Sequence, residues 1–374
     1  MEPIFPTAAG KLGFGCMRLP MDGENVDLPQ FRQMVDLYMA AGLNYFDTAH
    51  VYIGGQSETA LREALVRRYP RDAYFLTDKL SGSCYQRRED IRPLLLEQLD
   101  ACGVSYFDLV LVHAVTAEVY RKAQDCHAFE ELARLRDEGR IRHIGVSFHD
   151  KPAVLARVLD EHPEIEVVQI QLNYMDIDNP AVESGAVYDL CVKRGKPVLV
   201  MEPVRGGALA KLPPAAEAII ADLHADSPAG YALRYAASFD GVVRVLSGMS
   251  TVEQMRDNIR TLAGPQPLDE NERAALARVK GILRAENAVP CTGCRYCAAG
   301  CPMDIPIPDL FACYNAVRRY DDWPSRYYYG VCTQGHGKPS DCVGCRQCER
   351  ICPQHLPVTD YLKQAGELLE TPAG

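Results

Sequence analysis

This sequence of 374 residues is poor in tryptophan, in long apolar runs and in positive charge. It has one tryptophan, and no stretch approaches the ~18 apolar residues that cross a membrane. Its formal net charge of −10 argues against a nucleic acid or an anionic membrane surface as a partner. The first residues, Met-Glu-Pro-Ile-Phe-Pro, show neither the basic segment nor the apolar run of a secretory signal peptide. We therefore expect a cytoplasmic protein without a membrane or nucleic-acid partner.

A disulfide framework is also missing, although cysteine is abundant. Of the 15 cysteines, eight fall in two regular runs, and the other seven are an odd number at scattered spacings. Such cysteines suit free thiols in a reducing compartment better than secreted disulfides. The seven are Cys16, Cys84, Cys102, Cys126, Cys191, Cys313 and Cys332.

The two cysteine runs share one pattern, C-x-x-C-x-x-C-x-x-x-C-P. Their members are Cys291, Cys294, Cys297 and Cys301, and then Cys342, Cys345, Cys348 and Cys352. Three cysteines at this spacing surround one [4Fe–4S] cluster, and in two-cluster ferredoxins the fourth ligates the other cluster. Zinc sites usually bring two cysteine pairs, or cysteine with histidine, without a third close cysteine. The sequence therefore predicts two [4Fe–4S] clusters.

The ligands of each predicted cluster come from both runs. The fourth cysteine of each run follows a three-residue gap and precedes a proline, which turns the chain away from its own loop. One cluster is assigned to Cys291, Cys294, Cys297 and Cys352, and the other to Cys342, Cys345, Cys348 and Cys301.

Short apolar runs alternate with amphipathic helical stretches over the first 265 residues. Eight such units predict an α/β fold, a (β/α)8 TIM barrel. A doubly wound sheet shows the same alternation, but it usually carries G-x-G-x-x-G after its first strand, and Gly10, Gly13 and Gly15 have the wrong spacing. The predicted strands are 12–15, 44–47, 74–79, 107–113, 143–148, 167–172, 197–202 and 242–247. The predicted helices are 29–41, 57–69, 89–101, 128–138, 152–159, 180–194, 228–238 and 252–262.

The chain changes character near Gly264. We expect the barrel in residues 1–265, a bridging helix and linker in residues 266–289, and a small, helix-rich, ferredoxin-like iron–sulfur domain in residues 290–374. The bridging helix, 268–285, has acids near its start and bases near its end, as the helix dipole favours. Two further helices are predicted at 308–320 and 359–369.

Four ionisable residues lie at or just beyond the ends of consecutive predicted strands, where a TIM barrel carries its chemistry. They are Asp47, Tyr52, Lys79 and His113. Singly, each has a structural explanation: a turn cap, a surface aromatic, a lysine with a buried stem, or a satisfied core histidine. Together they predict a site, because a lysine or histidine that ends so apolar a run needs a partner or a function.

In order and context these four residues resemble those of the aldo/keto reductases. The likeness spans about residues 10–263, and the cysteine runs make the chain look like the ferredoxin-fused branch of that family. Its further segments are 13–20 (GFGCMRLP), 144–147 (IGVS), 168–170 (VQI), 201–207 and 253–258.

The resemblance implies that a carbonyl compound is reduced by a nicotinamide cofactor bound without a Rossmann fold. Tyr52 would protonate the nascent alkoxide, and Lys79 would lower the pKa of that tyrosine. Asp47 would keep the lysine charged, and His113 would orient the carbonyl. A phenol of pKa ~10 is a poor proton relay at neutral pH unless a cation stabilises its anion.

The resemblance also assigns cofactor-binding residues. Ser147 and Gln169 match positions that hydrogen-bond the nicotinamide carboxamide. Gly248 and Asn258 lie in the segment that holds the rest of the cofactor.

Cofactor choice rests on three positions that clamp the 2′-phosphate in NADPH-binding members of the family. They are Gly248, Met249 and Gln254 here, and none is basic. Because a phosphate dianion needs charged donors, we expect NADH to be favoured over NADPH. A substitute base such as Arg256, or weak nicotinamide binding, is the alternative.

These observations predict an oxidoreductase whose barrel handles hydride and whose clusters exchange single electrons. Its partners would be a small-molecule carbonyl substrate and a ferredoxin or another redox protein. A flavin could divide the electron pair, but no motif indicates one. The alternatives are an electron-transfer or redox-sensing subunit with a non-catalytic barrel, and clusters that only staple a small domain. Tyr327, Tyr328 and Tyr329 are expected to form local core.

Overall fold

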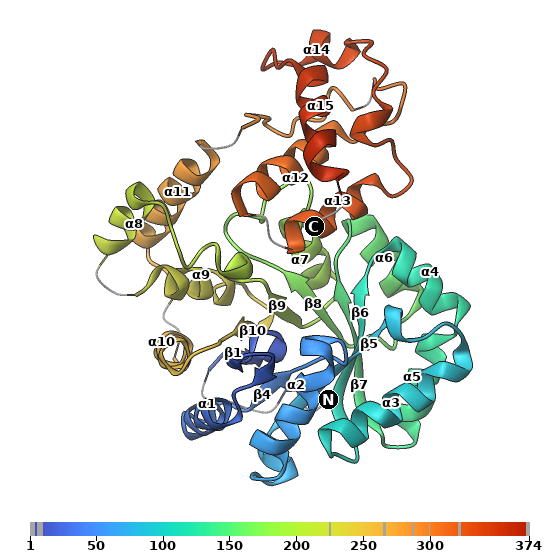
Figure 1. Ribbon diagram of the computed structural model, residues 1–374, viewed down its shortest axis with the longest axis vertical. Helices are drawn as coiled ribbons and strands as arrows, with labels where there is room; N and C mark the ends of the chain where they lie inside the picture. The colour runs from blue at the N-terminus through green and yellow to red at the C-terminus, as the bar shows by residue number, and fades with distance from the viewer. Residues whose placement is uncertain are drawn as a thin grey trace.

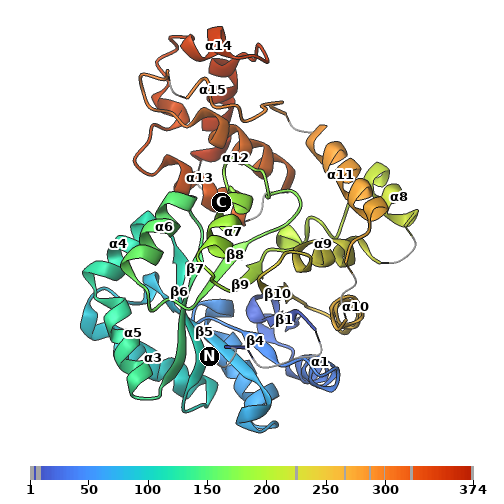
Figure 2. The same cartoon turned by 180° about the vertical axis from the view of Figure 1, so that it is seen from behind.

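The computed structural model describes residues 4–5, 10–223, 226–264, 267–285, 288–298, 300–320 and 323–371. Within them, eight parallel strands close into a barrel in the order β1-β10-β9-β8-β7-β6-β5-β4, with helices outside it (Figures 1 and 2). The strands are β1 (Leu12–Gly15), β4 (Tyr45–Asp47), β5 (Phe75–Ser81), β6 (Phe107–Val115), β7 (Ile141–Phe148), β8 (Val167–Gln171), β9 (Val198–Met201) and β10 (Val242–Gly248). The predicted (β/α)8 barrel is therefore confirmed, and each predicted strand is present with small shifts at its ends.

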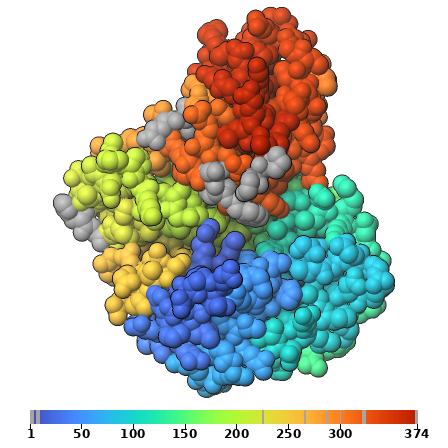
Figure 3. Space-filling model, viewed as in Figure 1, coloured from blue at the N-terminus to red at the C-terminus, as the bar shows by residue number. Residues whose placement is uncertain are grey.

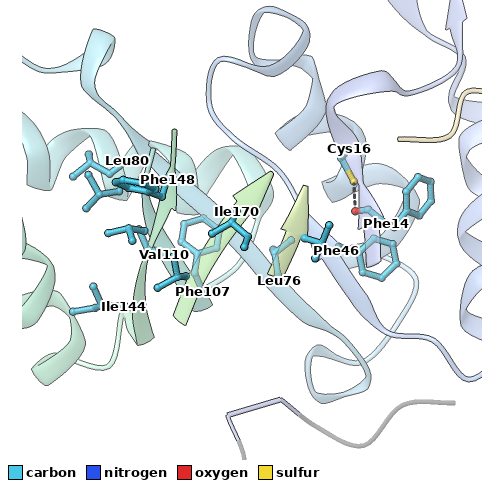
Figure 4. Packing of buried hydrophobic residues seen from close by; sticks show 14 of the residues in the cluster. Phe14, Cys16, Phe46, Leu76, Leu80, Phe107, Val110, Ile144, Phe148 and Ile170 are labelled. Carbon is cyan, nitrogen blue, oxygen red and sulfur yellow. Dashed lines mark hydrogen bonds between the residues drawn. The ribbon is translucent and has the colours of Figure 1, made fainter. Parts of the chain in front are cut away.

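The helices that surround the barrel cover the outer face of its strands. They are α1 (Leu28–Ala40), α2 (Gln56–Leu61), α3 (Arg88–Cys102), α4 (Ala117–Asp125), α5 (Ala128–Asp137), α6 (Pro152–Glu161), α7 (Ser184–Lys193), α8 (Pro214–Ala221), α9 (Pro228–Ala237) and α10 (Val252–Leu262). Strand residues that point outward, such as Phe46, Leu76 and Ile170, pack in one buried layer under these helices (Figure 4). Residues that point inward, such as Leu109 and Leu199, fill the barrel. Burial on both faces explains why the strands read as continuous apolar runs.

Several elements differ from the sequence-based expectations. A small hairpin, β2 (Met21–Asp22) and β3 (Asn25–Val26), lies between β1 and α1, and α4 and α8 were not predicted. The helix predicted at 180–194 begins at Ser184. The carbonyl groups of Pro180 and Ala181 instead accept hydrogen bonds from the Lys151 ammonium, and this side-chain contact holds the chain outside the helix.

The C-terminal region begins with a helix that packs on the barrel. Helix α11 (Glu270–Ala285) buries Leu276, Val279 and Leu283 in one cluster with Ile219 and Ile220 of α8. This arrangement agrees with the predicted bridging helix. It leads the chain from the barrel wall to the first cysteine run.

The remaining helices form a small body at the C-terminal ends of the strands (Figures 1 and 3). They are α12 (Ile307–Tyr320), α13 (Trp323–Thr333), α14 (Gln347–Ile351) and α15 (Val358–Leu369). Their buried residues make a core separate from that of the barrel. Helices α12 and α13 face the barrel, whereas α14 lies at the far end (Figure 1). No helix of the described ranges is long and apolar enough to span a membrane.

Candidate functional site

The centre of the site is a buried ion pair between neighbouring strands. Strand β5 carries Lys79 and β4 ends at Asp47, and the two strands pair in parallel. The Lys79 ammonium donates to Asp47 Oδ1 and to the Thr48 carbonyl, the latter at 2.8 Å, and Lys79 is fully buried. Burial lowers the pKa of Lys79, but the Asp47 carboxylate more than offsets it, so the net pKa lies above the ordinary value. The lysine is therefore a fixed cation.

Tyr52 lies directly against this cation. It begins a short 3-10 turn after β4, and the next residues, Ile53 and Gly54, adopt positive φ angles of 52° and 60°. The Lys79 ammonium lies 4.7 Å from the centre of the tyrosine ring. Burial raises the pKa of Tyr52, and the charge of Lys79 opposes this shift without cancelling it. The phenol is therefore held protonated, which suits a proton donor.

His113 completes the group on the next strand, β6. Its Nδ1 lies 2.7 Å from Ser81 Oγ, and the two residues are paired across β5 and β6. The Tyr52 and His113 ring centres are 5.8 Å apart, edge to face. Burial, the Lys79 cation and His149 hold the pKa of His113 well below its ordinary value. The imidazole is neutral, with Nε2 left for a ligand.

These side chains border a cavity of about 790 Å³ at the C-terminal ends of the strands. Asp47, Tyr52 and His113 lie in its wall, and Lys79 lies behind them. The cavity wall also includes Pro324 and Tyr327 of α13. The site is therefore built from both parts of the chain.

The four predicted cofactor-binding residues divide into two groups. Ser147, Gln169 and Gly248 line the cavity. The Gln169 amide nitrogen donates to Asp47 Oδ2 at 3.0 Å, so its carbonyl oxygen is the group left for a ligand. Asn258 is not in the cavity wall; its amide donates to Ser247 Oγ at 2.9 Å. Asn258 supports the end of β10 from behind.

Sequence reasoning missed four residues of this site. Ser81 binds His113, and His149 lines the cavity with its ring centre 5.4 Å from that of Tyr327. The Tyr327 hydroxyl donates to the Ala114 carbonyl at 3.2 Å. Arg18 lines the cavity beside Gly248, where an added Cβ would lie 3.2 Å from the arginine Cβ. Arg18 could have been assigned to the site from closure of the barrel, because Gly15 and Gly248 are paired across the first and last strands.

Tyr327, Tyr328 and Tyr329 all contribute to local core, as expected, and one of them has a further contact. Tyr328 is 4% exposed and belongs to the core of the C-terminal helices. Tyr327 packs against the same core and also lines the barrel cavity. Successive helix residues point in directions about 100° apart, so one tyrosine packs inward while its neighbour reaches the barrel.

The eight cysteines surround two further cavities in the C-terminal region. Cys291, Cys294 and Cys297 border one together with Cys352. The other is bordered by Cys342, Cys345, Cys348 and Cys301. Each cavity therefore takes three thiols from one run and one from the other, so these residues could hold clusters in the predicted crossed arrangement.

The four thiols of each set surround a cavity and do not converge on the position of a single ion. Among the described residues, no three His, Cys, Asp or Glu side chains are placed to hold a single metal ion, and a cubane cluster has its ligands further apart. Burial raises the pKa of Cys297 to about 12 and that of Cys348 to about 11. Such thiols are protonated without metal, and ligation would release their protons.

Both parts of the chain match models of known protein families. The model of the aldo/keto reductase family matches residues 11–280. A model described as a 4Fe-4S dicluster domain matches residues 290–356. The chain belongs to the aldo/keto reductase family and carries a C-terminal 4Fe-4S dicluster domain. It is an oxidoreductase by family, as the sequence predicted.

Individual relatives cover the barrel part of the chain. An uncharacterized oxidoreductase of Schizosaccharomyces pombe, C215.11c, is 27% identical over 263 residues, which are 67% of this chain and 80% of the relative. The uncharacterized oxidoreductase YqkF of Bacillus subtilis is 26% identical over 300 residues, or 71% of this chain and 91% of the relative.

Solved structures agree on the fold. The holo form of an aldo-keto reductase from Bacillus halodurans superposes with a TM-score of 0.58 at 25% identity, covering 72% of this chain and 91% of its own. An aldo-keto reductase from Klebsiella pneumoniae in complex with NADPH gives a TM-score of 0.57 at 20% identity, covering 72% of this chain and 90% of its own.

Proposed function

We propose that the barrel reduces an aldehyde or ketone, or oxidises the corresponding alcohol, with a nicotinamide cofactor. We further propose that two [4Fe–4S] clusters exchange electrons with this site. The observation that supports the proposal best is the arrangement of Asp47, Lys79, Tyr52 and His113 at a cavity that α13 of the iron–sulfur domain also lines.

The chemistry follows from the protonation states of these groups. A reduced nicotinamide would supply the hydride to the carbonyl carbon. The protonated Tyr52 donates its proton to the carbonyl oxygen as negative charge develops there. Lys79 stabilises the tyrosinate that remains, and Asp47 keeps the lysine charged. The neutral His113 donates a hydrogen bond to the same oxygen through Nε2, since Ser81 holds Nδ1.

The cavity has the groups that a nicotinamide needs. Ser147 and Gln169 lie side by side on β7 and β8 and offer a hydroxyl and a carbonyl oxygen to a carboxamide. Gly248 leaves the end of β10 open to a nucleotide, and Asn258 holds that strand end in place.

NADH is the favoured cofactor in this proposal. Gly248 has no side chain, Met249 is fully buried, and the Gln254 carbonyl oxygen accepts from the Ser250 amide at 2.7 Å. None of them supplies a charge for a 2′-phosphate. Calorimetry should give NADH an affinity at least equal to that of NADPH. A clear preference for NADPH would mean that another cation binds the 2′-phosphate. Arg18, which lies beside Gly248, would then be the first residue to test, as Arg18→Gln.

The crossed ligand sets give two clusters that lie close together. Cys352 would complete the cluster of Cys291, Cys294 and Cys297, and Cys301 that of Cys342, Cys345 and Cys348. Cys297 of one set and Cys348 of the other belong to the same buried cluster of residues, which supports neighbouring clusters. Two neighbouring one-electron centres can together handle the two electrons of a hydride.

An anaerobic titration tests the proposal. NADH and NADPH are added separately to the iron-loaded protein with a panel of aldehydes and ketones, and cluster absorbance and carbonyl loss are followed together. Bleaching of the clusters with turnover supports the relay. Turnover without bleaching assigns the clusters a structural role. If neither occurs, the barrel is a non-catalytic scaffold and the protein an electron-transfer or redox-sensing subunit.

The remaining assignments belong to the same proposal. A ferredoxin or another redox protein would be the partner of the clusters. A reducing cytoplasm is the compartment that suits clusters and free thiols. A flavin has no supporting motif, and an absorbance spectrum of the supernatant after denaturation would reveal one.

A further inference from the structure

The two cysteine loops repeat the same sequence and the same backbone conformation. Both read C-x-G-C-R-x-C. The glycines, Gly293 and Gly344, have φ angles of 71° and 69°. The arginines, Arg295 and Arg346, have φ angles of 65° and 56°. Corresponding positions can therefore be compared directly.

The first loop, residues 291–297, is docked on the barrel. The Arg295 guanidinium donates to Glu183 Oε1 at 2.8 Å and to the Pro180 carbonyl at 3.1 Å. A Cβ added to Gly293 would lie 3.5 Å from the Pro180 ring. In this loop, the arginine binds an acidic side chain and the glycine allows a close approach.

A buried carboxylate fixes this contact. Asp309 of α12 accepts from Arg295 at 2.9 and 3.0 Å, and its Oδ1 lies 3.3 Å from the Lys151 ammonium. Lys151 also reaches Glu183 at 3.2 Å. Two cations and two carboxylates thus join the first loop to the barrel, and Asp309 is only 3% exposed.

The second loop, residues 342–348, presents the same surface to solvent. A Cβ added to Gly344 would meet nothing within 4 Å. The Arg346 side chain is 68% exposed, and its ionic contact among the described residues is Glu349 at 3.9 Å. Val343 is 63% exposed and Ile351 46% exposed. Helix α14, which carries Ile351, lies at the end of the molecule away from the barrel (Figure 1).

Two arginines of the second loop and α14 are exposed at this end, beside the exposed carboxylate of Asp341. Arg346 and Arg350 both face solvent. The Glu349 carboxylate turns inward and accepts from the Thr359 amide at 2.9 Å and from its hydroxyl at 2.5 Å. Val343 and Arg346 border the cavity of Cys342, Cys345 and Cys348, and Arg350 and Ile351 follow on α14.

We propose that this distal surface, made of Val343, Arg346, Arg350 and Ile351, docks a small acidic one-electron carrier protein. A carboxylate of the carrier binds Arg346 as Glu183 binds Arg295, and its apolar rim covers Val343 and Ile351. Cys301, Cys342, Cys345 and Cys348 would hold the cluster that accepts one electron from the reduced carrier, with no bond or proton changed. The inference rests on the proposed function, because it presumes redox-active clusters.

The test is the rate at which a small acidic ferredoxin, reduced beforehand, reduces the clusters of the full-length iron-loaded protein in stopped-flow. Arg346→Glu and Arg350→Glu should each lower the second-order rate constant about ten-fold, because opposite charges guide and orient such encounters. The wild-type rate should fall with added salt, and the variants should lose much of that dependence. Lys193→Glu makes the same charge change at an exposed position in α7 and should leave the rate unaltered.

Iron content and reduction by dithionite confirm that each variant keeps its clusters. If Arg346→Glu loses iron, the test of the docking surface rests on Arg350→Glu, because Arg350 does not border the cluster cavity. Wild-type rates in the charge-reversal variants overturn the proposal, as does a wild-type rate that does not change with salt. Failure of the proposed function gives another result: the carrier reduces the clusters, but no electrons reach the barrel cofactor.

Discussion

The barrel site and the cysteine sites are organised in opposite ways. In the barrel, Lys79, Asp47 and His113 are held by hydrogen bonds that need no ligand. In the C-terminal domain the thiols border cavities, and burial raises the pKa of Cys291, Cys297 and Cys348. The first site is organised by protein groups alone, whereas the thiols of the second would be drawn together by the proposed clusters.

The cores of the two regions follow the same division. The barrel core runs around all its strands and every outer helix except α8. The core of the C-terminal domain is small, and cysteines such as Cys297 and Cys348 are part of it. Loss of the clusters should therefore damage the small domain and leave the barrel folded, except where Tyr327 and Arg295 connect the two.

The largest expected effect is in the barrel. Tyr52→Phe keeps the ring but removes the proton donor, so carbonyl reduction should fall by roughly 10²-fold or more. Iron content should stay normal, because no cysteine is touched. Steady-state kinetics with iron analysis measure both. Tyr188→Phe, which loses a surface hydrogen bond to Asp240, is the matched control and should keep full activity; equal rates in both variants would remove Tyr52 from the chemistry.

The next effect is in the cysteine domain and tests the crossed ligation. Cys352→Ser should damage the cluster of Cys291, Cys294 and Cys297, and Cys301→Ser should damage the other. EPR and iron analysis of both variants distinguish the clusters. If Cys352→Ser damages only the cluster of Cys342, Cys345 and Cys348, each run supplies all four ligands of its own cluster and the crossed assignment is wrong.

Chelation of iron extends the same comparison to stability. Residues 290–360 should exchange their amide hydrogens much faster as one unit, because the crossed clusters close a long loop. The barrel should keep its protection. Hydrogen exchange followed by mass spectrometry measures this, and loss of protection throughout the barrel would contradict the division into two regions.

A smaller effect is expected at the junction. Tyr327→Ala removes a ring from the cavity wall and should raise KM for the carbonyl substrate roughly ten-fold, with kcat less affected. Tyr327→Phe keeps the ring and loses the hydrogen bond to Ala114, so its KM should stay near that of the wild type. Unchanged KM in Tyr327→Ala would mean that the iron–sulfur domain covers the cavity without contacting the substrate.

The smallest effect concerns buried acids beneath the barrel site. Burial raises the pKa of Glu58 to about 7, and burial with the Glu58 charge raises the pKa of Asp78. A carboxyl whose pKa is higher in the folded than in the unfolded state contributes its full stabilisation at pH values below the unfolded pKa. For Glu58 this contribution is lost as the pH rises through about 7. A folded-state pKa that lies one pH unit above the unfolded value changes the free energy of unfolding by about 1.4 kcal/mol.

This pH dependence is measured by calorimetry of the barrel transition. The wild-type Tm should be lower at pH 8 than at pH 6, and Asp78→Asn should reduce that difference because it removes a second buried carboxyl whose raised pKa also makes stability fall as the pH rises. Glu24→Gln changes an exposed carboxylate and should leave the difference unchanged. An equal pH dependence in Asp78→Asn and wild type would exclude the buried pair as its cause.

Much of the fold was predictable because its signals are local. The apolar runs at 107–113 and 242–247 mark strands by themselves, and they are present as β6 and β10. Helix α13 was missed, since its tyrosine-rich sequence lacks a clear amphipathic pattern. The start of α7 was placed too early, because a distant lysine, Lys151, holds the preceding carbonyls.

Residue types and their spacing along the chain were enough to predict which cofactors this protein would bind. Two complete cysteine runs and four ionisable residues at strand ends specify their chemistry within short segments, where spacing fixes geometry. Tertiary structure decided which distant groups meet. Closure of the barrel brings Arg18 to Gly248, and packing of α13 brings Tyr327 to Ala114. Docking of one of two loops that share the C-x-G-C-R-x-C pattern sets Arg295 on Glu183 and leaves Arg346 exposed. Such pairs depend on packing across the whole molecule, so nothing in the sequence near either partner encodes them.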